Sequence, residues 1–148
     1  MLTLEGAQAG LNWATILKKR DGYRKAFDKF DFNKVAKYSD RKKASLMKDS
    51  GIIRNRLKIH STVENAKALI QIRKEYGTFN KYIWGFVDGK PIVHGKQPSK
   101  TAISEQMSKD LKKRGFRFVG PTICYAFMQA AGLVNDHVTS CHRYKALK

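Results

Sequence analysis

Residues 111–125 read LKKRGFRFVGPTICY and contain the signals for the end of one helix and the start of another. Gly115 stands where a helix with a basic end must stop, because glycine readily adopts the backbone angles found just past a helix C-terminus. Pro121 suits the first turn of a second helix, where its missing N–H costs no hydrogen bond. A tight turn between Gly115 and Gly120 therefore joins two predicted helices. Residues 111–131 form a predicted helix-hairpin-helix element.

The turn of this element is suited to contact a phosphate backbone. The first N–H groups of a helix have no partner within that helix and form a ready anion site. Basic side chains flank the turn, and its glycines permit close approach. Contacts of this kind position DNA without reading its sequence. We expect DNA-binding positions at Arg114, Gly115, Arg117, Val119 and Gly120, and an ordinary corner between two helices is the alternative.

Charge is the strongest signal in the composition. The 148 residues include 30 Lys and Arg against 12 Asp and Glu, a net charge of +18. This excess favours a nucleic acid partner, because neutralising phosphates rewards dense positive charge. No run approaches the roughly 20 apolar residues that cross a bilayer, and no basic amphipathic helix with an aromatic face is present. We expect no membrane association and a cytoplasmic location.

Helical periodicity dominates the remainder of the chain. Apolar residues recur every three or four positions, and good N-cap residues precede several of these runs. The expected helices cover residues 4–20, 23–30, 40–49, 55–76, 78–87, 102–114 and 121–131. Only residues 91–93 look extended, and 94–99 read as a polar loop. The sequence predicts one all-α domain over residues 1–148, with Cys124 in a core and no disulfide scaffold.

Several long segments resemble DNA-3-methyladenine glycosylase I, a family of helix-hairpin-helix DNA glycosylases. They are LEGAQAGLNW at 4–13, ILKKR at 16–20, YR at 23–24, GIIRNR at 51–56, KKRGFRFVGPTICY at 112–125 and MQAAGLVNDHV at 128–138. The resemblance implies a helix-hairpin-helix glycosylase fold. It also implies a base-excision repair enzyme that flips and hydrolytically removes 3-methyladenine from alkylated double-stranded DNA. Family members carry a further N-terminal stretch ahead of the equivalent of Met1, so we expect a truncated member.

The resemblance places Glu5 and Trp13 in the pocket for the flipped base. A base alkylated at N3 is cationic and leaves easily, so the protein mainly has to select and hold it. An anionic acceptor at Glu5 suits the edge of such a base, and the ring of Trp13 suits its face. On one helix over residues 4–20 the two side chains would lie within about 80° of each other. A carboxylate favoured by the helix dipole and a core aromatic are the alternatives.

Residues 8–11 resemble the family segment that enters DNA at the vacated base. Gln8 and Gly10 belong to it, and Leu11 would be the apolar wedge that fills an unstacked step. A core leucine is an equal alternative at this position.

A second set of residues concerns zinc. His137 and Cys141 are spaced H-x₃-C, which lets both face one ion. The resemblance makes them the C-terminal half of a structural zinc site whose other Cys and His lie in the N-terminal stretch, so the site is incomplete here. Asn135 stands near the place where the wider superfamily usually has an assisting Asp. Asp136 beside it is an alternative for that role, or a residue of local hydrogen bonding.

Three functions remain open from the sequence. The first is the glycosylase, with double-stranded DNA containing alkylated bases as its partner and a monomer as the expected state. The second is a non-catalytic helix-hairpin-helix DNA-binding fragment, which the missing N-terminal stretch favours. The third is a basic helical scaffold for RNA or protein. Glu5 and Trp13 favour the enzyme, because a binding module needs neither a pocket acid nor a stacking ring.

Overall fold

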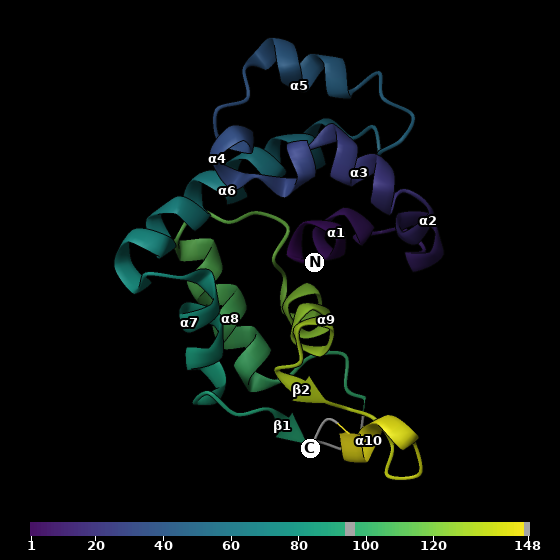
Figure 1. Ribbon diagram of the computed structural model, residues 1–148, viewed down its shortest axis with the longest axis vertical. Helices are drawn as coiled ribbons and strands as arrows, with labels where there is room; N and C mark the ends of the chain where they lie inside the picture. The colour runs from purple at the N-terminus through teal and green to yellow at the C-terminus, as the bar shows by residue number, and fades with distance from the viewer. Residues whose placement is uncertain (94–96, 147–148) are drawn as a thin grey trace.

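Nearly all regular secondary structure is helical over the residues that the structure, a computed structural model, describes: 1–93 and 97–146 (Figure 1). This confirms the expected all-α class. The elements are α1 (Leu2–Gln8), α2 (Trp13–Lys18), α3 (Arg20–Ala26), η1 (Asp28–Phe30), α4 (Phe32–Val35), α5 (Asp40–Leu46), α6 (Arg56–Tyr76), α7 (Phe79–Trp84), η2 (Gly85–Val87), β1 (Ile92–Val93), α8 (Ala102–Lys113), α9 (Pro121–Ala131), β2 (Val134–Asn135) and α10 (His142–Ala146). The segment 94–96, which includes His94 of the expected polar loop, lies outside the described residues.

The long helix α6 joins two hydrophobic cores. Its first half contributes Ile59 and Val63 to a core shared with α1 to α5. Its second half contributes Ala68 and Ile72 to a core shared with α7, α8 and α9. Figure 1 shows α1 between the two groups, and α1 packs on both α6 and α9. The helix α1 therefore lies where the two halves of the molecule meet.

Capping residues fix the ends of α6 as the sequence predicts. The Asn55 side chain accepts a hydrogen bond from the Lys58 N–H at 3.0 Å, which satisfies one free donor of the first turn. Gly77 ends the helix with φ of 79°, in the region where glycine is favoured.

The two helices expected on either side of the turn at 115–120 are present as α8 and α9. Thr101 and Ser104 form a reciprocal capping box at the start of α8. Gly115 follows α8 with φ of 95°, and Pro121 occupies the first turn of α9 as expected. Cys124 is fully buried in the second core, which confirms its predicted place.

The single helix expected over residues 4–20 is wrong. The chain breaks after α1, where Gly10 has φ of 73°. The Asn12 side chain then accepts a hydrogen bond from the Ala14 N–H at 2.7 Å and starts α2. Apolar periodicity continues across the break, but a capping asparagine next to a glycine overrides it.

Smaller differences also separate the structure from the sequence expectations, among them the short helices α4 and α10, which were not expected. The helix expected over 23–30 ends at Ala26, and the three residues of η1 all have positive φ. The helix expected over 40–49 ends at Leu46. Residues 92–93 are extended as predicted, but their parallel partner β2 was not expected.

None of the described helices is both long and apolar enough to cross a lipid bilayer.

Candidate base pocket and DNA interface

Glu5 is a buried carboxylate near the middle of α1. Its side chain is 5% exposed, and no hydrogen bond or ion pair of the described residues engages its oxygens. Desolvation raises the pKa of Glu5 above its ordinary value of 4.5, and the α-amino group of Met1 partly offsets this rise. A buried acid without a cationic side chain against it is costly to keep charged. Such a group favours a cationic ligand that supplies the missing partner.

Trp13 begins α2 on the far side of the chain break from Glu5. It is half-buried and packs against the first core. The helices α1 and α2 contact each other, so the two residues lie on neighbouring packed helices. The relative position of Glu5 and Trp13 is therefore set by the turn at residues 9–12. It is not set by one shared helix, as the sequence suggested.

That turn is ordered and presents Leu11 to solvent. The Leu11 N–H donates to the Gln8 carbonyl at 2.7 Å, and Gln8 Nε2 donates to the Leu11 carbonyl at 3.0 Å. The Leu11 side chain is 38% exposed, which excludes the core alternative. Gly10 is exposed, with open space where a side chain would stand. Residues 8–11 thus form a closed turn with an apolar side chain at its surface.

The hairpin turn lies between α8 and α9 and presents mainly backbone. Arg117 is exposed, whereas Val119 is 1% exposed and belongs to the second core. The Val119 carbonyl accepts a hydrogen bond from the Ser108 hydroxyl at 2.6 Å. Gly120 precedes α9 and supplies no side-chain cap, so no side chain satisfies the first N–H groups of α9. These open donors and Arg117 make the turn suited to an anion.

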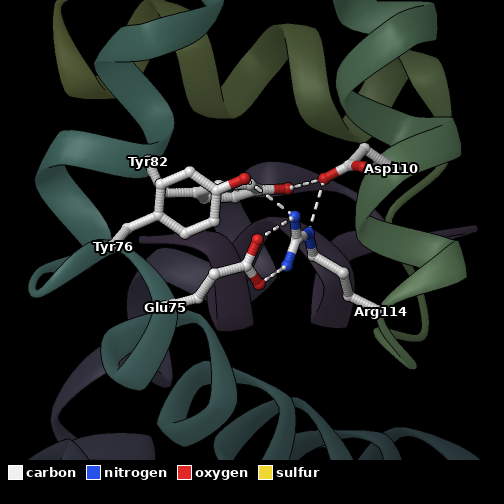
Figure 2. Close-up of polar contacts among 5 residues, drawn as sticks. All are labelled: Glu75, Tyr76, Tyr82, Asp110 and Arg114. Atoms are coloured by element: carbon white, nitrogen blue, oxygen red, sulfur yellow. Dashed lines mark hydrogen bonds and ion pairs between the residues drawn. The ribbon is translucent and has the colours of Figure 1, made fainter.

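Arg114 occupies a cluster that ties α8 to the end of α6 (Figure 2). Its guanidinium donates to both oxygens of Glu75, at 2.5 and 3.2 Å, and to Asp110 Oδ2 at 2.7 Å. It also lies over the rings of Tyr76 and Tyr82, at 5.1 Å from each centroid. Hydrogen bonding to Arg114 lowers the pKa of Glu75. DNA contact by Arg114 stays a prediction. No local pattern around Arg114 indicates its structural role.

His137 and Cys141 come together at the C-terminal end of the described chain. Cys141 Sγ lies 3.6 Å from His137 Nδ1. A tetrahedral ion with Zn–S of about 2.3 Å and Zn–N of about 2.0 Å separates two such ligand atoms by about 3.6 Å. The pair therefore fits two positions of one zinc site. No group of three or more His, Cys, Asp or Glu side chains within 1–93 and 97–146 is placed to hold a metal.

Asn135 and Asp136 both serve local hydrogen bonding. Asp136 Oδ2 accepts from the Tyr125 hydroxyl at 2.5 Å and from Gln129 Nε2 at 2.8 Å. The pKa of Tyr125 is raised, mainly by burial and secondarily by the hydrogen bond to Asp136. Asn135 Oδ1 accepts from the His137 N–H at 3.2 Å and so orders the start of the segment that carries the histidine.

Sequence reasoning missed two polar residues of α6 that contact the turns described above. Lys58 binds carbonyls at the end of α1, and Asn65 binds the backbone of Arg117. Both partners lie about fifty residues away along the chain, at 49–52 positions. No local pattern could have revealed them.

Comparison with known proteins places this geometry in a family. The family model described as methyladenine glycosylase matches residues 1–144. DNA-3-methyladenine glycosylase of Haemophilus influenzae is 49% identical over 95% of this chain and 78% of its own length. DNA-3-methyladenine glycosylase 1 of Escherichia coli is 48% identical over 100% of this chain and 82% of its own length.

A solved structure agrees with these relatives. The crystal structure of a variant of 3-methyladenine DNA glycosylase I in complex with 3-methyladenine has a TM-score of 0.93 and 37% identity, and the match covers 95% of this chain and 78% of that one. The chain belongs to the methyladenine glycosylase family.

Proposed function

We propose that this protein is a monofunctional DNA glycosylase that removes 3-methyladenine from alkylated double-stranded DNA in base-excision repair. The observation that carries the proposal is the buried Glu5 carboxylate, which has no hydrogen-bonding or ion-pair partner among the described residues. Two relatives that are 48–49% identical carry the name DNA-3-methyladenine glycosylase, and a structural neighbour was solved with 3-methyladenine bound.

The chemistry follows from the charge of the damaged base. Water attacks C1′ of the deoxyribose, the bond from C1′ to the base breaks, and the bonding electrons neutralise the departing purine. The oxygen of the water becomes the C1′ hydroxyl, and its second proton passes to solvent. Because the base is already cationic, its departure needs little help. Glu5 accepts a hydrogen bond from the edge of the flipped base and compensates its charge, and Trp13 stacks on its face. The site therefore acts chiefly by recognition.

Two turns hold the DNA in this proposal. Residues 8–11 enter the duplex at the vacated base, with Leu11 as the apolar filler. The hairpin holds the phosphate backbone through Gly115, Gly120, the start of α9 and the side chain of Arg117. Val119 contributes backbone only, because its side chain is buried.

We further propose that His137 and Cys141 hold a structural zinc ion together with two donors from elsewhere. The separation of 3.6 Å between Sγ and Nδ1 supports this. Bound zinc would crosslink the C-terminal segment and take no part in the reaction. We expect the protein to be a cytoplasmic monomer.

Incubation with methylated duplex DNA tests the proposal. Free 3-methyladenine, separated from the polymer and quantified, is expected to accumulate with time in proportion to protein. Retention of the DNA by the protein with no release of base would overturn the proposed activity and leave a DNA-binding module.

A further inference from the structure

One face of α6 carries two side chains that bind the backbones of the two DNA-facing turns. Lys58 and Asn65 are seven positions apart, which is about two helical turns and about 10 Å along the axis. Lys58 contacts the end of α1, and Asn65 contacts the hairpin. A single straight element thus touches both turns.

The Lys58 ammonium caps the C-terminal end of α1. Its Nζ donates to the Ala7 carbonyl at 2.8 Å and to the Ala9 carbonyl at 2.7 Å. The last carbonyls of a helix have no partner within it and carry partial negative charge, so a cation there is favourable. Desolvation lowers the pKa of Lys58, consistent with an ammonium drawn against protein rather than into solvent. The contact fixes the point where residues 9–12 leave α1.

Asn65 holds the hairpin at its centre through a pair of hydrogen bonds. The Arg117 N–H donates to Asn65 Oδ1 at 2.7 Å, and Asn65 Nδ2 donates to the Arg117 carbonyl at 3.0 Å. Two bonds to one peptide position fix both the location and the orientation of that backbone. Phe118, the next residue, has a positive φ of 52°, a conformation that needs such support.

The helix α1 also meets the hairpin directly at Gly6, next to Glu5. A Cβ atom at Gly6 would lie 3.1 Å from the Phe118 carbonyl oxygen and 3.2 Å from Phe118 Cβ. The helix that carries the pocket acid is therefore in close contact with the hairpin. Small shifts of the hairpin must be transmitted to α1.

We propose that α6 is a spacer, and that Lys58 and Asn65 are positioning residues that set the separation between the turn at residues 9–12 and the hairpin. The inference rests on the proposed function, since it assigns these residues to placing the damaged base against Glu5 once the hairpin holds the phosphates. Neither side chain has to touch the base. Their loss misplaces one DNA-holding turn relative to the other, and a misplacement of about 1 Å costs up to about 100-fold in rate.

Six variants of the whole chain test the spacer: two that remove the contacts, two controls and two conservative replacements. Lys58→Met and Asn65→Leu remove the contacts at similar side-chain size. Lys67→Met removes one charge from α6, and Gln71→Leu removes one amide, both at exposed positions outside the contacts. The readouts are the single-turnover rate of 3-methyladenine release from duplex DNA, the affinity for duplex carrying an abasic-site analogue, and the affinity for free 3-methyladenine.

We expect Lys58→Met and Asn65→Leu to lower the single-turnover rate by about 10- to 100-fold and to weaken abasic-site binding. Binding of free 3-methyladenine stays at the wild-type value, because that ligand needs only the pocket. Both control variants behave as wild type in all three readouts. Lys58→Arg restores the rate, because a guanidinium also donates to two carbonyls, and Asn65→Asp gives an intermediate rate, because it keeps only the acceptor.

A parallel loss of all three readouts would show a general structural role and overturn the spacer. Wild-type rates in both contact variants would overturn it equally. If a contact variant fails to fold, Asn65→Asp carries the comparison, and a wild-type rate in that variant would overturn the spacer. If the wild-type chain releases no base, the proposed function fails, and abasic-site binding still decides whether the two residues position the turns.

Discussion

Replacing Glu5 with glutamine separates base recognition from DNA binding. Glutamine keeps the size of the side chain and one acceptor oxygen but removes the negative charge. Glu5 is 5% exposed and lies in the middle of α1, outside both the turn at residues 9–12 and the hairpin, so we expect the replacement to leave both turns in place. The variant therefore tests the negative charge together with the second acceptor oxygen of the carboxylate.

The expected loss of affinity follows from the kind of hydrogen bond that is lost. A hydrogen bond to a charged group contributes about 1.5–3 kcal/mol. Glu5→Gln should thus weaken binding of free 3-methyladenine by about 10- to 100-fold, since about 1.4 kcal/mol corresponds to tenfold. Binding of undamaged duplex DNA should remain near the wild-type value, because Arg117 and the open end of α9 supply those contacts.

The same replacement should not destabilise the protein. The pKa of Glu5 is raised in the folded state, so the folded protein holds this proton more tightly than the unfolded chain does. Its contribution to stability is fully present below the ordinary carboxyl pKa of 4.5 and is lost as the pH rises through the raised value. The Glu5→Gln variant has no ionisable carboxyl at this position and so avoids this loss of stability. Near neutral pH we expect it to be at least as stable as wild type.

Calorimetric titration with 3-methyladenine, duplex binding by anisotropy, and urea unfolding at acidic and neutral pH provide the three measurements. Equal loss of free-base and duplex binding would refute the pocket role of Glu5. A variant less stable than wild type at neutral pH, but not at acidic pH, would refute the desolvation argument.

Three further predictions concern other parts of the molecule. A Cβ atom at Gly22 would lie 2.1 Å from a facing backbone oxygen. The variant Gly22→Ala should therefore lower the free energy of unfolding by at least about 1–3 kcal/mol in urea titrations. A Cβ atom at Gly85 would meet open space, so Gly85→Ala should be neutral or stabilising. Arg117→Ala should reduce the slope of log affinity against log salt for any duplex by about 1, while Arg114→Ala should instead lower the melting temperature; a reversed assignment would contradict the geometry. Added Co²⁺ should give thiolate-to-metal absorption that Cys141→Ser abolishes, and a spectrum unchanged by that variant would remove the cysteine from the metal site.

Local signals made the hairpin predictable from the sequence. Gly115 adopts φ of 95°, which favours glycine, and a helix tolerates proline only in its first turn, where Pro121 lies. Both residues therefore indicate the ends of the two helices. The break between α1 and α2 was also marked locally by Gly10 and Asn12. The apolar periodicity across it favours a longer helix, but the positive φ of Gly10 and the cap at Asn12 separate the two helices.

Contacts between distant residues could not be predicted in the same way. The pairing of Arg114 with Glu75 spans 39 positions, and that of Asn65 with Arg117 spans 52. Nothing in the sequence around Arg114 distinguishes an arginine free to meet phosphate from one already bound to two carboxylates. The role of such residues depends on which helices pack together, and packing is set by the whole core.

The most direct test of the account is to count both products of the reaction with methylated duplex DNA. Hydrolysis of the bond between base and sugar predicts one abasic site for each free 3-methyladenine released, with intact strands, and an equal reduction of both products in Glu5→Gln. Intact duplex, with neither free base nor abasic sites despite binding, would contradict the claim that this chain is a glycosylase.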